Sequence, residues 1–187
     1  MIADLPSFPQ LFETALAFVI KAEGGYSNQG YDGGKMTYKG VTENAYIAYL
    51  KQMKKPVHPI AVEYPVNATP TGLSIFKYNK KGVYVNVHLL ITEYEVKDLY
   101  YRDYWLSSHC DKLTNHKLAI VVFDTSVNHG ISVAMRLLKQ SNYSIPVFLS
   151  LRAAEYRKDA SYPGQGIFLK GWLNRIEHLK AYIVNVK

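Results

Sequence analysis

Cysteine is nearly absent from this 187-residue chain, and metal-ligand spacings are missing as well. The single cysteine, Cys110, has no partner for an internal disulfide, so folding does not depend on an oxidising compartment. The six histidines include no pair four residues apart and no comparable ligand spacing. We therefore expect a fold without a disulfide framework, and a protein that uses neither a metal nor a cofactor.

Long apolar runs are missing too. No stretch of the sequence reaches the roughly 18 apolar residues of a membrane span. Residues 1–7 have neither the basic start nor the apolar core of a signal peptide. We expect a protein made in the cytoplasm in soluble form, so that any work outside the cytoplasm needs another export route.

Acidic residues are the minority among the charges. The 22 lysines and arginines exceed the 15 aspartates and glutamates and leave a net charge of +7. This excess favours an anionic partner such as nucleic acid, a membrane surface or the acidic polymers of a bacterial wall. The basic residues are scattered and form no long stripe, which argues against nucleic acid. The alternative is a basic surface that only keeps the protein soluble.

The hydrophobic pattern predicts a mainly α-helical chain. Apolar residues between 8 and 20 recur at helical spacing and form one buried stripe. Gly24 and Gly25 end this helix, because glycine readily adopts the left-handed conformation of a helix C-terminus. Thr42 and Thr92 are good N-caps for two later helices, the second within a capping box. Further apolar stripes bring the total to about seven helices.

One small β-hairpin is expected among the helices. Ser74–Tyr78 and Val83–Val87 alternate between apolar and polar side chains and flank a turn. The four prolines within residues 56–72 predict an irregular connection before the hairpin. The pattern therefore predicts a helical protein with a minor β component.

Glu23 falls at the end of the first predicted helix. The helical period places it on or near the buried face, where a carboxylate without a partner tends to keep its proton. The carbonyl groups of a last helical turn carry the negative end of the helix dipole and also disfavour ionisation. We expect both effects to raise the pKa of Glu23, as a general acid working near neutral pH requires.

Asp32 and Thr37 follow Glu23 in a segment broken by glycines, which let the chain fold back tightly. A protonated glutamate that faces a solvated aspartate, with a hydroxyl to hold a water, can cleave a glycosidic bond. One carboxyl group protonates the leaving oxygen, and the other stabilises positive charge or activates water. The alternative is that local amides satisfy Glu23 and that Asp32 shapes an Asx turn.

Short motifs in this region resemble those of a known family. They are Glu23-Gly24-Gly25-Tyr26, Asp32-x-Gly34 and Thr37-x-x-Gly40-Val41-Thr42. Their order resembles the N-terminal signature of glycoside hydrolase family 108, the lysozyme-like N-acetylmuramidases of phages and bacteria that include proteins once called secretion activators. Later segments are similar to the predicted peptidoglycan-binding domain of these proteins, at residues 104–105, 110–113, 123–130 and 171–175.

The resemblance implies roles for the residues that match its first motifs. Glu23 is the expected catalytic acid, with Asp32 and Thr37 as its partners in the same loop. Two features of this chain depart from the family pattern. Lys35 stands where a second glycine is expected, and the segment from 56 to 88 looks longer than usual.

Three further residues are candidates for binding substrate. Tyr26 directly follows the glycines and is placed to stack on a sugar ring, or to pack over the helix end. Asp124 and Asn128 lie four apart, hence on one helix face, beside a predicted helix stop. Asn128 there is placed to bond a substrate acetamido group. The alternative is that the two form a buried polar pair that ties their helix to the Glu23 loop.

These observations and the resemblance together predict a mainly α, lysozyme-like helical fold with one small β-hairpin. Residues 1–92 are expected to form the catalytic region with the hairpin as an insertion, and residues 93–187 a helical peptidoglycan-binding region, packed as one compact unit. The expected function is cleavage of the peptidoglycan glycan strand by a monomeric muramidase, for example a phage or prophage endolysin. Such a protein is made in the bacterial cytoplasm and reaches the wall or periplasm after lysis, or through a holin or another export partner.

Two alternatives stay open at this point. The chain could be a peptidoglycan-binding protein that has lost catalysis. It could also be an amidase or peptidase of the wall, an idea suggested by the adjacent His109 and Cys110. No helix N-terminus or oxyanion loop is implied by the neighbours of Cys110, which argues against a nucleophilic thiol.

Overall fold

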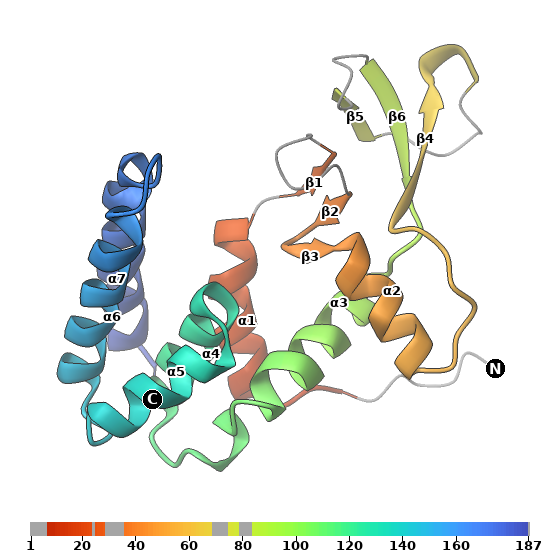
Figure 1. Ribbon diagram of the computed structural model, residues 1–187. Helices are drawn as coiled ribbons and strands as arrows, with labels where there is room; N and C mark the ends of the chain where they lie inside the picture. Colours follow the sequence, from red (N-terminus) through yellow and green to blue (C-terminus); the bar gives the residue numbers. More distant parts are fainter. Residues whose placement is uncertain (1–6, 24, 29–35, 69–74, 79–83, 187) are drawn as a thin grey trace. The chain divides into compact units, whose positions relative to one another are not determined.

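The computed structural model describes residues 7–23, 25–28, 36–68, 75–78 and 84–186, which form two compact units (Figure 1). The first unit consists of residues 1–19 together with 101–187, and the second of residues 20–100. The chain thus starts in the first unit, forms the second and returns to the first. This division differs from the expected one, which fell between residues 92 and 93.

The second unit combines helices with two small sheets. The first helix, α1 (Gln10–Glu23), runs into it from the first unit. The other elements are β1 (Tyr26–Ser27), β2 (Thr37–Tyr38), β3 (Val41–Thr42), α2 (Glu43–Gln52), β4 (Ala61–Pro65), a 3₁₀ turn (Val66–Ala68), β5 (Ile75–Tyr78), β6 (Tyr84–Leu89) and α3 (Glu93–Tyr100). Strands β1, β2 and β3 form one antiparallel sheet, and β4, β6 and β5 form the other in that order.

The predicted hairpin is confirmed, but the expected irregular connection before it was wrong. Strands β5 and β6 pair antiparallel, with Ile75 opposite Val87. Strand β4 pairs with the other side of β6, from Ala61 opposite Leu89 to Pro65 opposite Val85. Proline is compatible with this arrangement because β4 is an edge strand and Pro65 is its last residue. The prolines therefore bound the strand instead of preventing it.

Both predicted threonine caps are confirmed. The hydroxyl of Thr42 accepts from the backbone N–H of Ala45 at 3.3 Å and begins α2. At α3, the N–H of Glu95 donates to the Thr92 hydroxyl at 3.2 Å, and the N–H of Thr92 donates to the Glu95 carboxylate at 3.0 Å. These reciprocal bonds make the capping box that the sequence predicted.

The carboxylate of Glu95 also joins α2 to α3. It accepts from the Tyr46 hydroxyl at 2.9 Å and from Lys55 Nζ at 2.9 Å. Burial alone would raise the pKa of Glu95, but the hydrogen bonds from Lys55, Thr92 and Tyr46 hold it below its ordinary value. Beside it, the Tyr49 hydroxyl donates to the buried Asp98 at 2.9 Å. The second unit is therefore cross-linked by tyrosine hydroxyls that donate to buried carboxylates.

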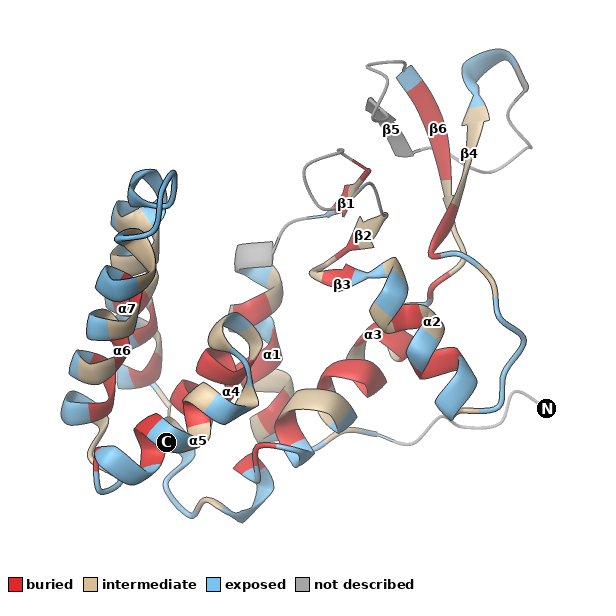
Figure 2. Ribbon diagram, viewed as in Figure 1, coloured by how far each residue is buried: buried red, intermediate tan, exposed pale blue. Residues whose placement is uncertain are grey.

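The first unit is helical. After the start of α1 it contains a π-helical turn (Tyr101–Leu106), a 3₁₀ turn (Cys110–Lys112), α4 (His116–His129), α5 (Ile131–Gln140), α6 (Ile145–Ala160), a second 3₁₀ turn (Gly166–Phe168) and α7 (Leu169–Val184). Helix α4 is buried continuously from Leu118 to Ser126 and forms the centre of this unit (Figure 2). The core is aromatic, since Phe12 of α1 packs edge-on against Trp105 at 5.7 Å and Phe123 at 5.8 Å between ring centroids.

The prediction of a mainly helical fold is confirmed, with seven α-helices in the described ranges. The β component is larger than expected, because two three-stranded sheets replace the single hairpin. The helix predicted to begin after Thr92 is followed directly by the π-helical turn, so that α3 itself ends at Tyr100. Among the described residues, no helix is both long and apolar enough to cross a membrane.

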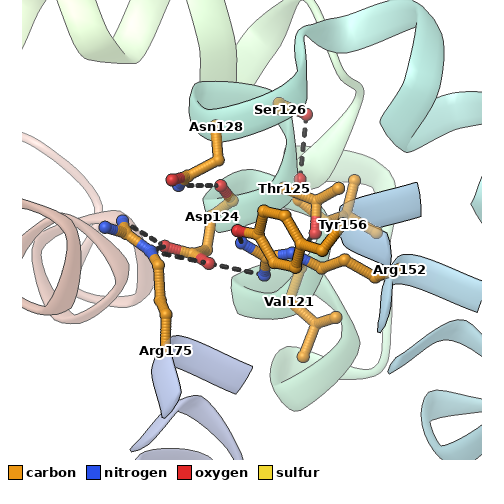
Figure 3. A network of polar contacts seen from close by, with 9 residues as sticks. Val121, Asp124, Thr125, Ser126, Asn128, Arg152, Tyr156 and Arg175 are labelled. Carbon is orange, nitrogen blue, oxygen red and sulfur yellow. Dashed lines mark hydrogen bonds and ion pairs between the residues drawn. The ribbon is translucent and has the colours of Figure 1, made fainter. Parts of the chain in front are cut away.

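A buried ion-pair network holds three helices of the first unit together (Figure 3). Asp124 of α4 is fully buried, and its carboxylate meets Arg152 Nη1 of α6 at 2.6 Å and Arg175 Nη2 of α7 at 2.7 Å. Arg152, also fully buried, donates a further hydrogen bond to the Tyr156 hydroxyl at 2.9 Å. Burial would raise the pKa of Asp124, but the two guanidinium groups hold it below its ordinary value.

We expect Asp124→Asn to destabilise the first unit strongly, by about 3–5 kcal/mol, because it leaves the buried Arg152 without its charge partner. Urea unfolding followed by tryptophan fluorescence measures this loss, since both tryptophans, Trp105 and Trp172, belong to the first unit. Glu177→Gln is the matched control. Its ion pair with Lys180 is exposed, so its loss should change the unfolding free energy by less than about 1 kcal/mol. Equal effects of the two substitutions would contradict the role given to Asp124.

The buried ring of His129 should make the unfolding free energy of the first unit depend on pH. Its ring packs against Tyr156 at 4.3 Å, and neither ring nitrogen has a hydrogen-bond partner among the described residues. Burial and the nearby Arg152 lower the pKa of His129 from its ordinary 6.5 to about 4, although Asp159, Glu155 and Asp124 oppose the shift.

Because the unfolded chain binds a proton at higher pH than the folded one, the unfolding free energy is highest above pH 6.5. It should fall as the pH falls from 6.5 toward about 4. Urea unfolding at a series of pH values should show this slope, and His129→Gln should reduce it. An unchanged slope in His129→Gln would show that other groups cause it.

Candidate active site

Glu23 is the last residue of α1, at the helix end where the sequence predicted it. Three residues later the chain reaches Tyr26, where β1 begins. The predicted acid therefore stands at the junction between a helix and the small β1–β2–β3 sheet. Asp32, the second predicted carboxylate, lies outside the described residues.

Thr37 lies in β2, in the middle strand of that sheet. It pairs with Ser27 of β1 on one side and with Thr42 of β3 on the other. This pairing shows that the chain leaves β1 and returns to lie beside β1 at Thr37. The return predicted from the glycine-broken segment is therefore present, and it places Thr37 next to the strand that follows Glu23.

Tyr26 is buried, and its hydroxyl donates to Glu63 Oε1 at 2.9 Å. The side-chain amide of Asn28, also buried, donates to the same oxygen at 2.8 Å. Burial raises the pKa of the Tyr26 hydroxyl, and the hydrogen bond and negative charge of Glu63 raise it further. Tyr26 thus joins β1 to β4, and its contact with a sugar ring stays a prediction.

Glu63 and Asn28 are site residues that the sequence analysis missed. Glu63 lies in β4, within the segment that the prolines had marked as irregular. Its alternation with Val62 and Tyr64 was the available signal for a strand, but no local pattern pairs residue 63 with residues 26 and 28. Because one carboxylate oxygen receives both hydrogen bonds, Glu63 couples the two sheets of this unit.

A second polar cluster fixes the turn between β2 and β3. Glu93 of α3 accepts from the Tyr38 hydroxyl at 2.7 Å and from Lys39 Nζ at 2.7 Å. The Tyr100 hydroxyl donates to the Lys39 carbonyl oxygen at 2.9 Å. Burial opposes ionisation of Glu93, but Lys39 and Tyr38 lower its pKa below the ordinary value. Charge-assisted hydrogen bonds from Tyr38 and Lys39 to Glu93 therefore fix the end of the strand that carries Thr37.

Asp124 and Asn128 belong to the first unit. Asn128 is exposed near the end of α4, and its amide donates to the Asp124 carbonyl oxygen at 2.8 Å. The Asp124 carboxylate is engaged by two guanidinium groups, which gives it a structural role between three helices (Figure 3). Contacts of either residue with substrate stay predictions.

Cys110 lies in surroundings that suppress a nucleophilic thiol. It is fully buried, its Sγ lies 3.1 Å from the Ser108 hydroxyl, and it donates to the Ala119 carbonyl oxygen at 3.4 Å. Burial raises the pKa of this thiol to about 12, so it stays protonated near neutral pH. The geometry argues against a cysteine peptidase. In the described part of the chain, no three His, Cys, Asp or Glu side chains gather in a way that could hold a metal ion.

Comparison with known proteins adds the following findings. A family model for glycosyl hydrolase 108 matches residues 16–130, a range that includes Glu23, Asp32 and Thr37. No curated protein matches the chain. The solved structure of SagA from Brucella abortus is similar, with a TM-score of 0.60 and 16% identity, over 92% of this chain and 93% of that one. At this identity the likeness shows a shared fold. Since the family match covers more than half of the residues, the chain belongs to the glycosyl hydrolase 108 family.

Proposed function

We propose that this protein is a muramidase that cleaves the glycan strand of bacterial peptidoglycan, with Glu23 as the general acid. The family match over residues 16–130 carries the proposal, because it assigns glycoside hydrolysis and contains Glu23 at the end of α1. The fold shared with SagA over nearly the whole chain agrees with it.

The chemistry follows from the position of Glu23 at a helix C-terminus. The carbonyl groups of the last turn carry partial negative charge, and this charge disfavours ionisation of a nearby carboxyl group. A glutamic acid that keeps its proton near neutral pH can protonate the leaving oxygen of a glycosidic bond. In this proposal Asp32 supplies the second carboxylate, and the Thr37 hydroxyl holds a water between them.

The polar contacts around β1 and β2 support this role by fixing the strands that flank the predicted catalytic loop. Tyr26 and Asn28 are tied to Glu63 before residues 29–35, and Thr37 pairs into the sheet after them. A site held by packing and hydrogen bonds keeps its groups in productive geometry at lower entropic cost. For substrate binding, we propose that exposed Asn128 bonds an acetamido group and that Tyr26 and Asp124 act through the contacts that position their neighbours.

The proposed partner is the peptidoglycan of a bacterial wall. A net charge of +7 favours attraction to an anionic wall polymer. The proposed place of action is the wall or periplasm, reached from the cytoplasm after lysis or through an export partner. The proposed working form is a monomer.

The central prediction concerns Glu23→Gln, which keeps the size of the side chain and removes the transferable proton. We expect turnover to fall on the order of 10²- to 10⁴-fold, the usual contribution of a general acid. The measurement is the release of reducing ends from purified bacterial walls. Glu177→Gln makes the same chemical change at an exposed site on α7 and should keep full activity. Wall cleavage at the wild-type rate by Glu23→Gln would refute the assignment.

The products released from purified walls also distinguish a muramidase from the two alternative functions. A muramidase releases reducing ends without free amines, whereas an amidase or peptidase releases free amines without reducing ends. A peptidoglycan-binding protein without catalysis would sediment with the walls and release neither. The wild-type product therefore tests the reaction class independently of the Glu23 substitution.

A further prediction tests the support given by Glu63. Glu63→Ala leaves the buried donors of Tyr26 and Asn28 without their acceptor, and should lower the unfolding free energy by about 1–3 kcal/mol. If this cluster positions the catalytic segment, turnover also falls at a temperature where the variant is fully folded. Glu63→Gln retains an acceptor oxygen and should recover most of both losses. If folded Glu63→Ala keeps full turnover, Glu63 stabilises the fold but does not position the catalytic segment.

A further inference from the structure

The connection between α6 and α7 is exposed along its whole length. We refer to residues 161–168 as the hairpin tip, since they join two neighbouring helices and are all exposed. The exposed fractions of Tyr162, Ile167 and Phe168 are 57%, 80% and 49%. The tip lies outside the range that the family model matches. The proposed catalysis therefore does not explain the apolar surface of the tip.

This concentration of exposed apolar side chains is unusual for the molecule. Elsewhere in the described ranges, large exposed apolar residues occur singly, as at Val57, or as two within five residues, as at Tyr143 and Val147, and scattered exposures are normal in soluble proteins. At the tip, three such side chains fall within seven residues, and Ile167 has the largest exposed fraction among them. Grouped apolar exposure of this kind marks interaction surfaces.

The backbone of the tip is held by successive hydrogen bonds. The N–H of Ser161 donates to the Lys158 carbonyl at 3.1 Å, that of Gln165 to Tyr162 at 3.0 Å, and that of Phe168 to Gln165 at 3.1 Å. Gly164 takes a positive φ of 78°, which its lack of a side chain permits. The apolar side chains are thus presented on a preformed turn, so that binding requires little additional ordering.

Stacked rings connect the tip to the buried network below it. Phe168 stacks on Trp172 at 5.8 Å between ring centroids, and Trp172 stacks on Tyr156 at 5.4 Å. Tyr156 accepts a hydrogen bond from the buried Arg152. The exposed end of this stack is therefore anchored in the core of the first unit.

Positive charges flank the tip. Arg157 and Lys158 are exposed in the last turn of α6, and Lys170 is exposed in the first turn of α7. No acidic residue occurs in the sequence between Asp159 and Glu177. The surface thus combines apolar and aromatic side chains at its end with three cations and one carboxylate, Asp159, around them, an excess of two positive charges.

We propose that the hairpin tip binds the surface of an anionic lipid bilayer. Tyr162, Ile167 and Phe168 enter the headgroup region, and the three cations contact lipid phosphates. Aromatic side chains with flanking lysine and arginine are typical of protein segments at a membrane interface. A second copy of the chain fits less well, because a stable interface buries roughly 800 Å² per partner, more than three side chains supply.

The test is co-sedimentation of the intact protein with vesicles. We expect binding to vesicles of phosphatidylglycerol mixed with phosphatidylcholine, weakened by salt, and little binding to phosphatidylcholine alone. Ile167→Ser combined with Phe168→Ser should reduce the partition by at least about tenfold. Removal of a cation, as in Lys170→Gln, should reduce it roughly fivefold.

Val57→Ser combined with Val147→Ser is the matched control, since it removes two exposed apolar side chains away from the tip and should bind like the wild type. Ile167→Ser alone leaves the Phe168–Trp172 stack in place and keeps the test valid if the double variant is unstable. Wild-type protein that ignores anionic vesicles would overturn the proposal. Tip variants that bind vesicles as well as the wild type would also overturn it. The same holds if the tip variants lose only their binding to walls, or only their self-association.

Discussion

A carboxylate removed from water must receive hydrogen bonds or meet a cation, and this requirement organises both units of the protein. In the first unit, Asp124 is fully buried and holds Arg152 and Arg175 from two other helices. In the second unit, Glu95 collects donors from α2 and from its own cap, and Glu63 collects donors from β1 and the residue after it. Each of these carboxylates, buried at Asp124 and Glu95 and half-buried at Glu63, therefore specifies which elements come together, as well as stabilising them.

The candidate active site depends on these contacts in the second unit. Glu23 ends a helix and is followed at once by β1, whose Tyr26 is fixed to β4 through Glu63. The middle strand carries Thr37, and its neighbour Tyr38 is fixed to α3 through Glu93. Tyrosine suits these positions because its ring fills apolar space while its hydroxyl reaches a carboxylate. Tyr26, Tyr38, Tyr46 and Tyr49 thus link carboxylates of the second unit to its hydrophobic core.

The two units use their surfaces differently. In the first unit the polar network is internal, and a chain of stacked rings leads from it to an exposed apolar tip flanked by cations. In the second unit the polar clusters lie around the strands next to the predicted catalytic acid. The proposed glycan cleavage and the proposed membrane attachment are compatible, since the residues assigned to the two roles do not overlap. The positive net charge favours both an anionic wall and an anionic bilayer.

The sequence by itself determined what depends on near neighbours. The end of α1 at Glu23, the Thr42 cap and the Thr92–Glu95 capping box were all predicted, because each depends on residues within about one helical turn. The family motifs are similarly local. Tertiary structure decided the rest: β4 exists because residues 61–65 pair with 85–89. Asp124 became a structural residue because Arg152 and Arg175, 28 and 51 positions away, meet it in the core. Contacts between residues so far apart in the sequence produce no local pattern that could predict them, since only folding brings these residues together.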